Sequence, residues 1–175
     1  HFALRLQPRS ARLQGMLGDI LAYQGKDQEA IEAYQKALEI DEFLPWIHNN
    51  LGVLLMEEGE LDQAVDLFHS AIDLNPLQTS AYRNLGNAHY DQRDWKEAAK
   101  AYQDALEIDF SLIDTKAAWA GLILQESRLV EARLVWEDVL LYDPRHPLAL
   151  QGLGVVALLE GEPGLAILYL DAARY

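Results

Sequence analysis

Small and large apolar residues return along this chain at a fixed spacing of 34 positions. One alanine keeps the spacing in every unit without an insertion or deletion: Ala30, Ala64, Ala98, Ala132 and Ala166. A repeat of this length is typical of a two-helix unit that stacks on copies of itself. Because one unit cannot bury its apolar face alone, its stability comes from its neighbours. The pattern predicts an all-α chain of antiparallel helix hairpins, with helices about 21 Å long.

Further registers keep the same phase. A small residue is needed where two helices cross closely, and one register holds Gly18, Gly52, Gly86, Ala120 and Gly154. A larger side chain there would separate the helices and leave voids. Large residues are needed to fill the space between hairpins, and another register holds Tyr34, Phe68, Tyr102, Trp136 and Leu170.

The small–large pattern is clearest in three segments: LGDILAYQGKDQEAIEAYQKALEID, LGVLLMEEGELDQAVDLFHSAIDLNP and LGNAHYDQRDWKEAAKAYQDALEID. It resembles the tetratricopeptide repeat, and the resemblance covers nearly the whole chain. It implies a right-handed superhelical solenoid whose first helices line a concave surface. We expect residues 1–10 to be the tail of a preceding repeat helix or an expression remnant. The remainder is expected to form one domain of five repeats: 11–44, 45–78, 79–112, 113–146 and 147–175.

The turns depart from the pattern in two ways. Glycine occupies the hairpin turn in three repeats, but Arg93 and Ser127 replace it in the other two, which predicts turns that are strained or of another type. Proline closes two of the second helices, but Glu42 and Phe110 stand in its place elsewhere. We therefore expect the second helices before Glu42 and Phe110 to continue into the next repeat.

The resemblance places ligand-facing positions on the first helices of the hairpins. The peptide-binding residues expected there are Tyr23, Trp46, Asn49, Asn50, Glu57, Arg83, Asn84, Asn87, Tyr90 and Asp91. Asn50 and Asn84 share a register, similar to the asparagine ladders of other helical-repeat domains. Their carboxamides either pair with the backbone of an extended peptide or brace neighbouring helices.

The carboxylate clamp of cochaperone repeats is excluded by the residues at its positions. Arg83 and Asn87 match its first pair, but Ala118, Leu148 and Gly152 follow. These three side chains offer no charged donor to a carboxylate. The acidic residues among the ligand-facing positions outnumber the basic ones, so we expect a neutral to basic peptide or protein.

The net charge of the chain also favours a neutral to basic partner. The chain has 14 Lys and Arg against 28 Asp and Glu, a formal net charge of −14. Nucleic acids and anionic lipid surfaces both attract basic proteins, so neither is an expected partner. No apolar run reaches the roughly 20 residues that span a bilayer, so this chain is not expected to insert into a membrane.

No constellation of residues indicates an enzyme. The chain has no cysteine, and its five histidines lack the four-residue spacing of a helical metal pair. We therefore expect no metal, no cofactor and no catalysis.

The last helix carries almost no polar face, which indicates a covered end. Leu165, Leu168 and Tyr169 are the residues expected to meet a partner or a second copy in a homodimer. The leading functional hypothesis is a scaffold that binds a peptide or partner protein, as in the assembly of a larger complex. The alternative is a substrate-recruiting or regulatory domain of an enzyme encoded elsewhere in the parent chain. Localisation follows from neither: the cytoplasm and membrane association through other parts of the parent chain both stay open.

Overall fold

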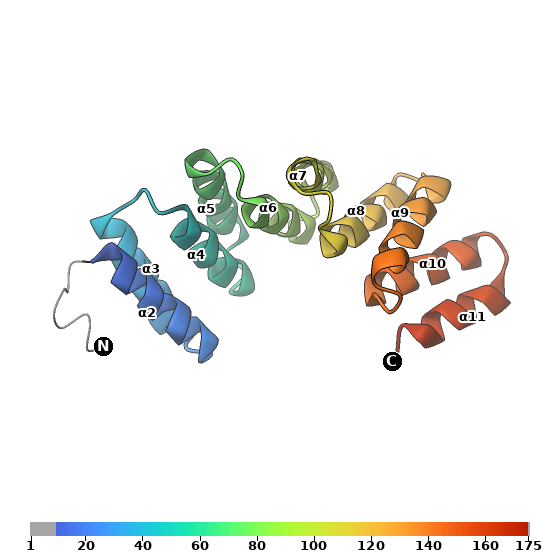
Figure 1. Ribbon diagram of the computed structural model, residues 1–175, viewed down its shortest axis with the longest axis horizontal. Helices are drawn as coiled ribbons and strands as arrows, with labels where there is room; N and C mark the ends of the chain where they lie inside the picture. The colour runs from blue at the N-terminus through green and yellow to red at the C-terminus, as the bar shows by residue number, and fades with distance from the viewer. Residues whose placement is uncertain (1–9, 175) are drawn as a thin grey trace. The chain divides into compact units, whose positions relative to one another are not determined.

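The computed structural model describes residues 10–174, and this part of the chain contains helices and turns but no strand (Figure 1). The prediction of an all-α solenoid of hairpins is confirmed. The helices are α2 (Ala11–Tyr23), α3 (Asp27–Ile40), α4 (Pro45–Glu57), α5 (Leu61–Leu74), α6 (Thr79–Asp91), α7 (Trp95–Ile108), α8 (Ile113–Gln125), α9 (Leu129–Tyr142), α10 (Pro147–Leu159) and α11 (Pro163–Ala172). Of the expected N-terminal tail, residues 1–9 lie outside the described residues. Ser10 caps α2 by accepting a hydrogen bond from the Leu13 N–H.

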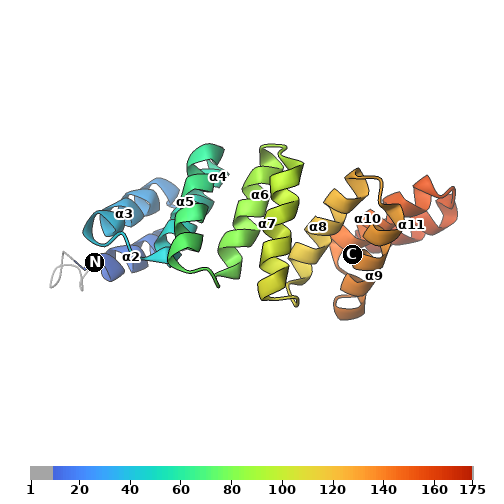
Figure 2. The same ribbon diagram turned by 90° about the horizontal axis from the view of Figure 1, so that it is seen from above.

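The chain divides into two compact units, here called unit 1, which runs to Ala98, and unit 2, which begins at Ala99. Unit 1 contains α2 to α6 and the first residues of α7. Unit 2 contains the rest of α7 and the hairpins α8–α9 and α10–α11, which pack side by side (Figure 2).

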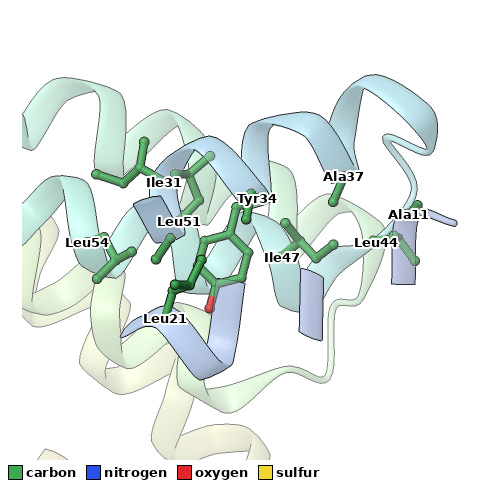
Figure 3. Packing of buried hydrophobic residues seen from close by; sticks show 11 residues of the cluster. Ala11, Leu21, Ile31, Tyr34, Ala37, Leu44, Ile47, Leu51 and Leu54 are labelled. Atoms are coloured by element: carbon green, nitrogen blue, oxygen red, sulfur yellow. The ribbon is translucent and has the colours of Figure 1, made fainter. Parts of the chain in front are cut away.

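The core of unit 1 forms where an aromatic side chain lies on a glycine of the neighbouring helix. Tyr34 of α3 is 2% exposed and contacts α2 at Gly18, where a Cβ would come within 2.5 Å of the ring. Ile47 and Leu51 of α4 complete the same cluster (Figure 3). Glycine at the crossing therefore lets two helices approach closely enough to enclose a whole tyrosine ring.

In the core of unit 2 a tryptophan lies on a glycine of the next hairpin, whereas Tyr34 and Gly18 belong to the same hairpin. Trp136 of α9 is 3% exposed, and a Cβ on Gly152 of α10 would come within 2.3 Å of its indole ring. The indole N–H donates to the carbonyl of Ala117 at 3.1 Å. The burial of this ring therefore leaves no unpaired indole donor.

The turn inside each of the five hairpins in residues 10–174 is the same. Its residue has a positive φ in each case, 68° at Gly25 and still 63° at Arg93 and 62° at Ser127. The Arg93 N–H bonds to the Tyr90 carbonyl, and the next N–H bonds to His89, as in a helix C-terminus with a left-handed residue. Of the two alternatives predicted for Arg93 and Ser127, the strained turn is the one observed, because both residues have the left-handed backbone conformation that favours glycine.

The turn between hairpins is made by a side chain rather than by proline. The second helices end at Ile40 and Ile108, so the expectation that they continue into the next repeat is wrong. A side-chain oxygen accepts the N–H two residues further on at one register in four repeats: Asp41, Asn75, Asp109 and Asp143. Such Asx turns compete with the helix and end it. At Asp109, hydrogen bonds from the Ser111 hydroxyl and N–H hold the pKa of the carboxyl below its usual value.

Candidate functional site

Four polar side chains on the first helices of unit 1 form a continuous chain of hydrogen bonds, here called the amide relay: Asp19, Asn49, Asn50 and Asn84. The Asn84 amide of α6 donates to Asn49 of α4 at 3.0 Å, and Asn49 donates to Asn50 at 3.1 Å. Asn50 in turn donates to Asp19 of α2 at 3.0 Å. The relay thus connects three successive first helices through side chains alone.

The hydrogen bonds of the amide relay join residues from different registers of the repeat. Asn50 and Asn84 share a register, but Asn49 lies between them in the hydrogen-bond chain. Asn49 and Asn84 are each 7% exposed, whereas Asn50 is half-buried and Asp19 is exposed. Asn84 and Asn49 therefore brace neighbouring helices, and the accessible part of the relay is its Asn50–Asp19 end.

A tyrosine from the second helix closes that end of the relay. The Tyr34 hydroxyl donates to the Asp19 carboxylate at 2.7 Å. Burial, the hydrogen bond to Asp19 and the charge of Asp19 raise the pKa of Tyr34, while a hydrogen bond with Asn50 lowers it to a smaller extent. The amide nitrogen of Asn50 is thus in contact with Asp19 and Tyr34, and its carbonyl oxygen keeps a lone pair beyond the one that Asn49 uses. The accessible atoms of the relay are mainly acceptors.

The predicted aromatic residues flank the relay with different degrees of exposure. Tyr23 is 94% exposed at the end of α2. Tyr90 is 43% exposed and packs edge-to-face on Trp95, with ring centroids 5.1 Å apart. Trp46 is half-buried, because its ring packs on Gly15 of α2. A Cβ at Gly15 would lie within 2.4 Å of that ring. Of the three, Tyr23 has the most surface to offer a ligand.

The other residues predicted to bind a peptide also differ in how exposed they are. The carboxylates Glu57 and Asp91 are exposed at the ends of α4 and α6. Arg83 and Asn87 are half-buried on α6. The exposed charge on this wall of unit 1 is therefore mostly negative, and Asp19 at the accessible end of the relay adds to it.

The first helices of unit 2 carry a different surface. Ala118 and Gly121 of α8 offer almost no side chain, and a Cβ on Gly121 would meet nothing within 4 Å. On α10, apolar side chains occupy the exposed positions: Leu148 at 50%, Val155 at 42% and Leu159 at 65%. The amide relay thus has no counterpart at these positions.

The predicted C-terminal surface is divided between solvent and core. Leu168 of α11 is 68% exposed and Leu165 is 39% exposed. Tyr169 is partly buried and packs against the core cluster of unit 2. Leu165 and Leu168 are therefore the part of this predicted surface that a partner can reach.

Unit 2 also holds a buried cation that sequence reasoning did not find. Lys116 of α8 is 4% exposed and forms an ion pair with Asp138 at 2.8 Å. Its ammonium lies 3.6 Å from the centre of the Phe110 ring. This cation packs against its own unit, so it is not available to a ligand. Within the described residues no group of three or more His, Asp or Glu side chains could hold a metal ion, and no helix could cross a membrane.

Comparison with solved structures places this fold among repeat proteins. The structure described as "Functional Characterization of Pseudomonas Aeruginosa pilF" matches with a TM-score of 0.87 at 22% identity, over 98% of this chain and 79% of that chain. YrrB, described as a TPR protein with an unusual peptide-binding site, matches with a TM-score of 0.80 at 22% identity, over 98% of this chain and 88% of that chain. The first TPR of Spaghetti (RPAP3), bound to the HSP90 peptide SRMEEVD, matches with a TM-score of 0.66 at 24% identity, over 67% of this chain and 94% of that chain. These likenesses establish the fold alone.

The sequence itself matches known families, although no curated protein matches it. The family described as TPR repeat matches residues 18–57. The family described as Tetratricopeptide repeat matches residues 49–110 and 124–175, which is more than half of the chain. The chain therefore belongs to the tetratricopeptide repeat family.

Proposed function

We propose that this chain is a protein-interaction module that holds a peptide or an extended segment of a partner on the first helices of unit 1, as a scaffold within a larger complex. The observation that carries the proposal is the amide relay, in which side chains of α2, α4 and α6 are already held by hydrogen bonds. A prearranged polar surface loses less conformational freedom on binding than a mobile one. Tetratricopeptide repeats generally act as non-enzymatic interaction modules, and we assign no reaction to this one.

The chemistry of the relay favours a donor-rich ligand. Asp19 and Asn50 present oxygen atoms, and Glu57 and Asp91 add exposed carboxylates on neighbouring helices. Backbone N–H groups, lysine and arginine are the groups that satisfy such acceptors. Tyr23 supplies an exposed aromatic anchor of the kind that dominates binding energy at interfaces. The partner is therefore proposed to be neutral to basic.

The peptide in the RPAP3 structure gives a contrast in charge. Its sequence SRMEEVD is acidic, and an acidic ligand needs charge-assisted donors on the repeat. In this chain the exposed residues beside the relay are mostly carboxylates. The same fold is therefore proposed to bind a peptide of opposite charge here.

Calorimetric titration with two peptides of equal length, one rich in lysine and one rich in glutamate, tests the proposal. We expect the basic peptide to bind more tightly, and the double variant Tyr23→Ala/Asn50→Ala to weaken it about tenfold. Gln125→Ala is the matched control, because Gln125 holds the register of Tyr23 in unit 2. Preference for the acidic peptide, or unchanged binding by a folded double variant, would reject the proposal.

A further inference from the structure

The second helices of the repeats expose a line of residues, here called the outer stripe, at four positions with spacings of four, three and four. These positions lie on one face of a helix. All are polar and exposed in α3, α5 and α7: Gln28, Glu32, Gln35 and Glu39; Asp62, Asp66, His69 and Asp73; Lys96, Lys100, Gln103 and Glu107. Stacking of the repeats therefore does not require apolar residues at these positions.

The outer stripe of α9 is aliphatic at three of the four positions. Val130 is 68% exposed, Leu134 is 60% exposed and Leu141 is 80% exposed. The third position holds Glu137, which is also exposed. Single exposed apolar residues are ordinary on a protein surface, but three aligned on one helix, where the other repeats have polar residues, mark an interaction surface. On α11, Leu168 holds the register of Leu134, but Gly164 holds that of Val130.

A further hairpin stacked in the manner of the others would not cover this stripe. Within unit 1, the residues of α3 that pack in the same cluster as α4 include Ile31, which is 6% exposed and directly precedes Glu32. Glu32 and Glu39 of the outer stripe remain exposed beside that packed neighbour. The stripe of α9 occupies the positions of Glu32 and Glu39, so only a partner on the outer side of unit 2 can bury it.

The position of Glu137 opposes a second copy of the chain as that partner. In an antiparallel pair of α9 helices related by a two-fold axis through the middle of the stripe, Val130 faces Leu141 of the copy and Leu134 faces Glu137. Each copy would therefore bury its Glu137 carboxylate against a leucine. The cations at α9 are already paired, Arg128 with Glu126 and Glu131, and Arg133 with Glu160. Burial of a carboxylate without a cation as partner is costly, whereas a cation from a different protein would complement Glu137.

We propose that the outer stripe of α9 is a second docking surface, which binds an amphipathic helix of a partner protein. The partner helix carries aliphatic residues on one face, which pack between Val130, Leu134 and Leu141. It also carries a lysine or arginine that reaches Glu137. Helices with this pattern bind other helices through rows of side chains spaced three and four residues apart. The surface is separate from the amide relay, so the two sites can hold two segments at once.

Three synthetic helical peptides of equal length test this proposal. The first has leucines on one face and lysines beside them, the second replaces the lysines with glutamates, and the third is a scrambled form of the first. Binding to the full chain is measured by fluorescence anisotropy at about 0.15 M salt, where charge attraction at long range is screened. We expect the first peptide to bind more tightly than the second and the third.

Variants locate the binding on α9. The triple variant Val130→Gln/Leu134→Gln/Leu141→Gln is expected to weaken the first peptide at least tenfold without a change in thermal midpoint, because these side chains are exposed. Val155→Gln/Leu159→Gln is the matched control on the first helices of unit 2 and is expected to leave the affinity unchanged. Glu137→Lys is expected to reverse the preference between the lysine and glutamate peptides.

Four outcomes would overturn the proposal: equal binding of the scrambled peptide, full binding by the triple glutamine variant, no reversal in Glu137→Lys, or a dimer in sedimentation that the triple variant converts to monomer. The last result would identify a second copy as the occupant. Loss of binding in Tyr23→Ala/Asn50→Ala concerns the proposed function alone, so failure at one surface does not imply failure at the other.

Discussion

Units 1 and 2 both pack an aromatic ring on a glycine, within one hairpin in unit 1 and between two hairpins in unit 2, but they expose chemically different side chains. In unit 1 an aromatic ring rests on Gly18, and the first helices are joined by hydrogen-bonded amides. In unit 2 an aromatic ring rests on Gly152, but the first helices expose leucine and valine, and the outer stripe of α9 is aliphatic. The one buried lysine among the described residues, Lys116, also belongs to unit 2.

The difference shows which positions of a repeat are constrained by folding and which are available for recognition. Crossing residues stay small and interlocking residues stay large in both units, because a misfit there costs packing throughout the hairpin. Exposed positions have no such constraint, so unit 1 can present acceptors while unit 2 presents aliphatic side chains. Substitutions in the core, at Tyr34 and at the hairpin turns test this comparison.

The largest effect is expected for Gly152→Ala in unit 2. Its Cβ would come within 2.3 Å of the Trp136 ring, so the ring or the helix must shift, at a cost of about 1–3 kcal/mol in the free energy of unfolding. Gly121→Ala is the matched control in the same unit. Its Cβ would meet nothing within 4 Å, so it should gain up to about 1 kcal/mol from helix propensity.

Urea unfolding followed by tryptophan fluorescence measures both variants. Equal stability of Gly152→Ala and Gly121→Ala would mean that the close contact between α9 and α10 is not required. The comparison between the units would then lose its glycine–aromatic contact in unit 2.

An intermediate effect that depends on pH is expected for Tyr34→Phe in unit 1. Near neutral pH the variant loses the hydrogen bond to Asp19, worth about 1 kcal/mol. The pKa of Tyr34 is raised in the folded protein, whereas in the unfolded chain it is about 10. Above pH 10 the unfolded state loses this proton first, so the free energy of unfolding of the wild type falls as pH rises towards the folded pKa.

The phenylalanine variant lacks this contribution, so its deficit should shrink between pH 8 and pH 11. Denaturant titrations of both proteins at these two pH values check the prediction. A deficit that is constant over this range would show that the Tyr34 phenol is not shielded in the folded state.

The smallest effect is expected at the hairpin turns, where glycine is absent from one turn in each unit. Arg93→Gly and Ser127→Gly keep the positive φ of 63° and 62° but remove the Cβ that disfavours it, a penalty of about 1–2 kcal/mol. Glycine also loses more backbone entropy on folding, about 0.5–1 kcal/mol. A net gain of about 0.5–1 kcal/mol should appear as a higher thermal midpoint by calorimetry. A lower midpoint in either variant would contradict the left-handed turn.

The fold class was predictable because it depends on residues that contact the same register in every repeat. The end of each second helix was not, because it depends on Asp and Asn at one register rather than on proline: Asp41, Asn75, Asp109 and Asp143. At the candidate site, the sequence indicated the asparagines but not their order in the relay. Asn84 reaches Asn49 rather than Asn50, and Asn50 reaches Asp19, and these pairings depend on how adjacent helices are offset.

The uniform hairpin turns have a consequence for how the chain folds. Each turn is closed by two backbone hydrogen bonds between residues only a few positions apart, as from Asp94 to His89. The helices of a hairpin therefore meet without a long conformational search, and topologies dominated by such local contacts fold quickly. Nucleation can begin in any repeat and spread to its neighbours, so on the ribosome the α2–α3 hairpin could pack on α4 and α5 before the later repeats are synthesised.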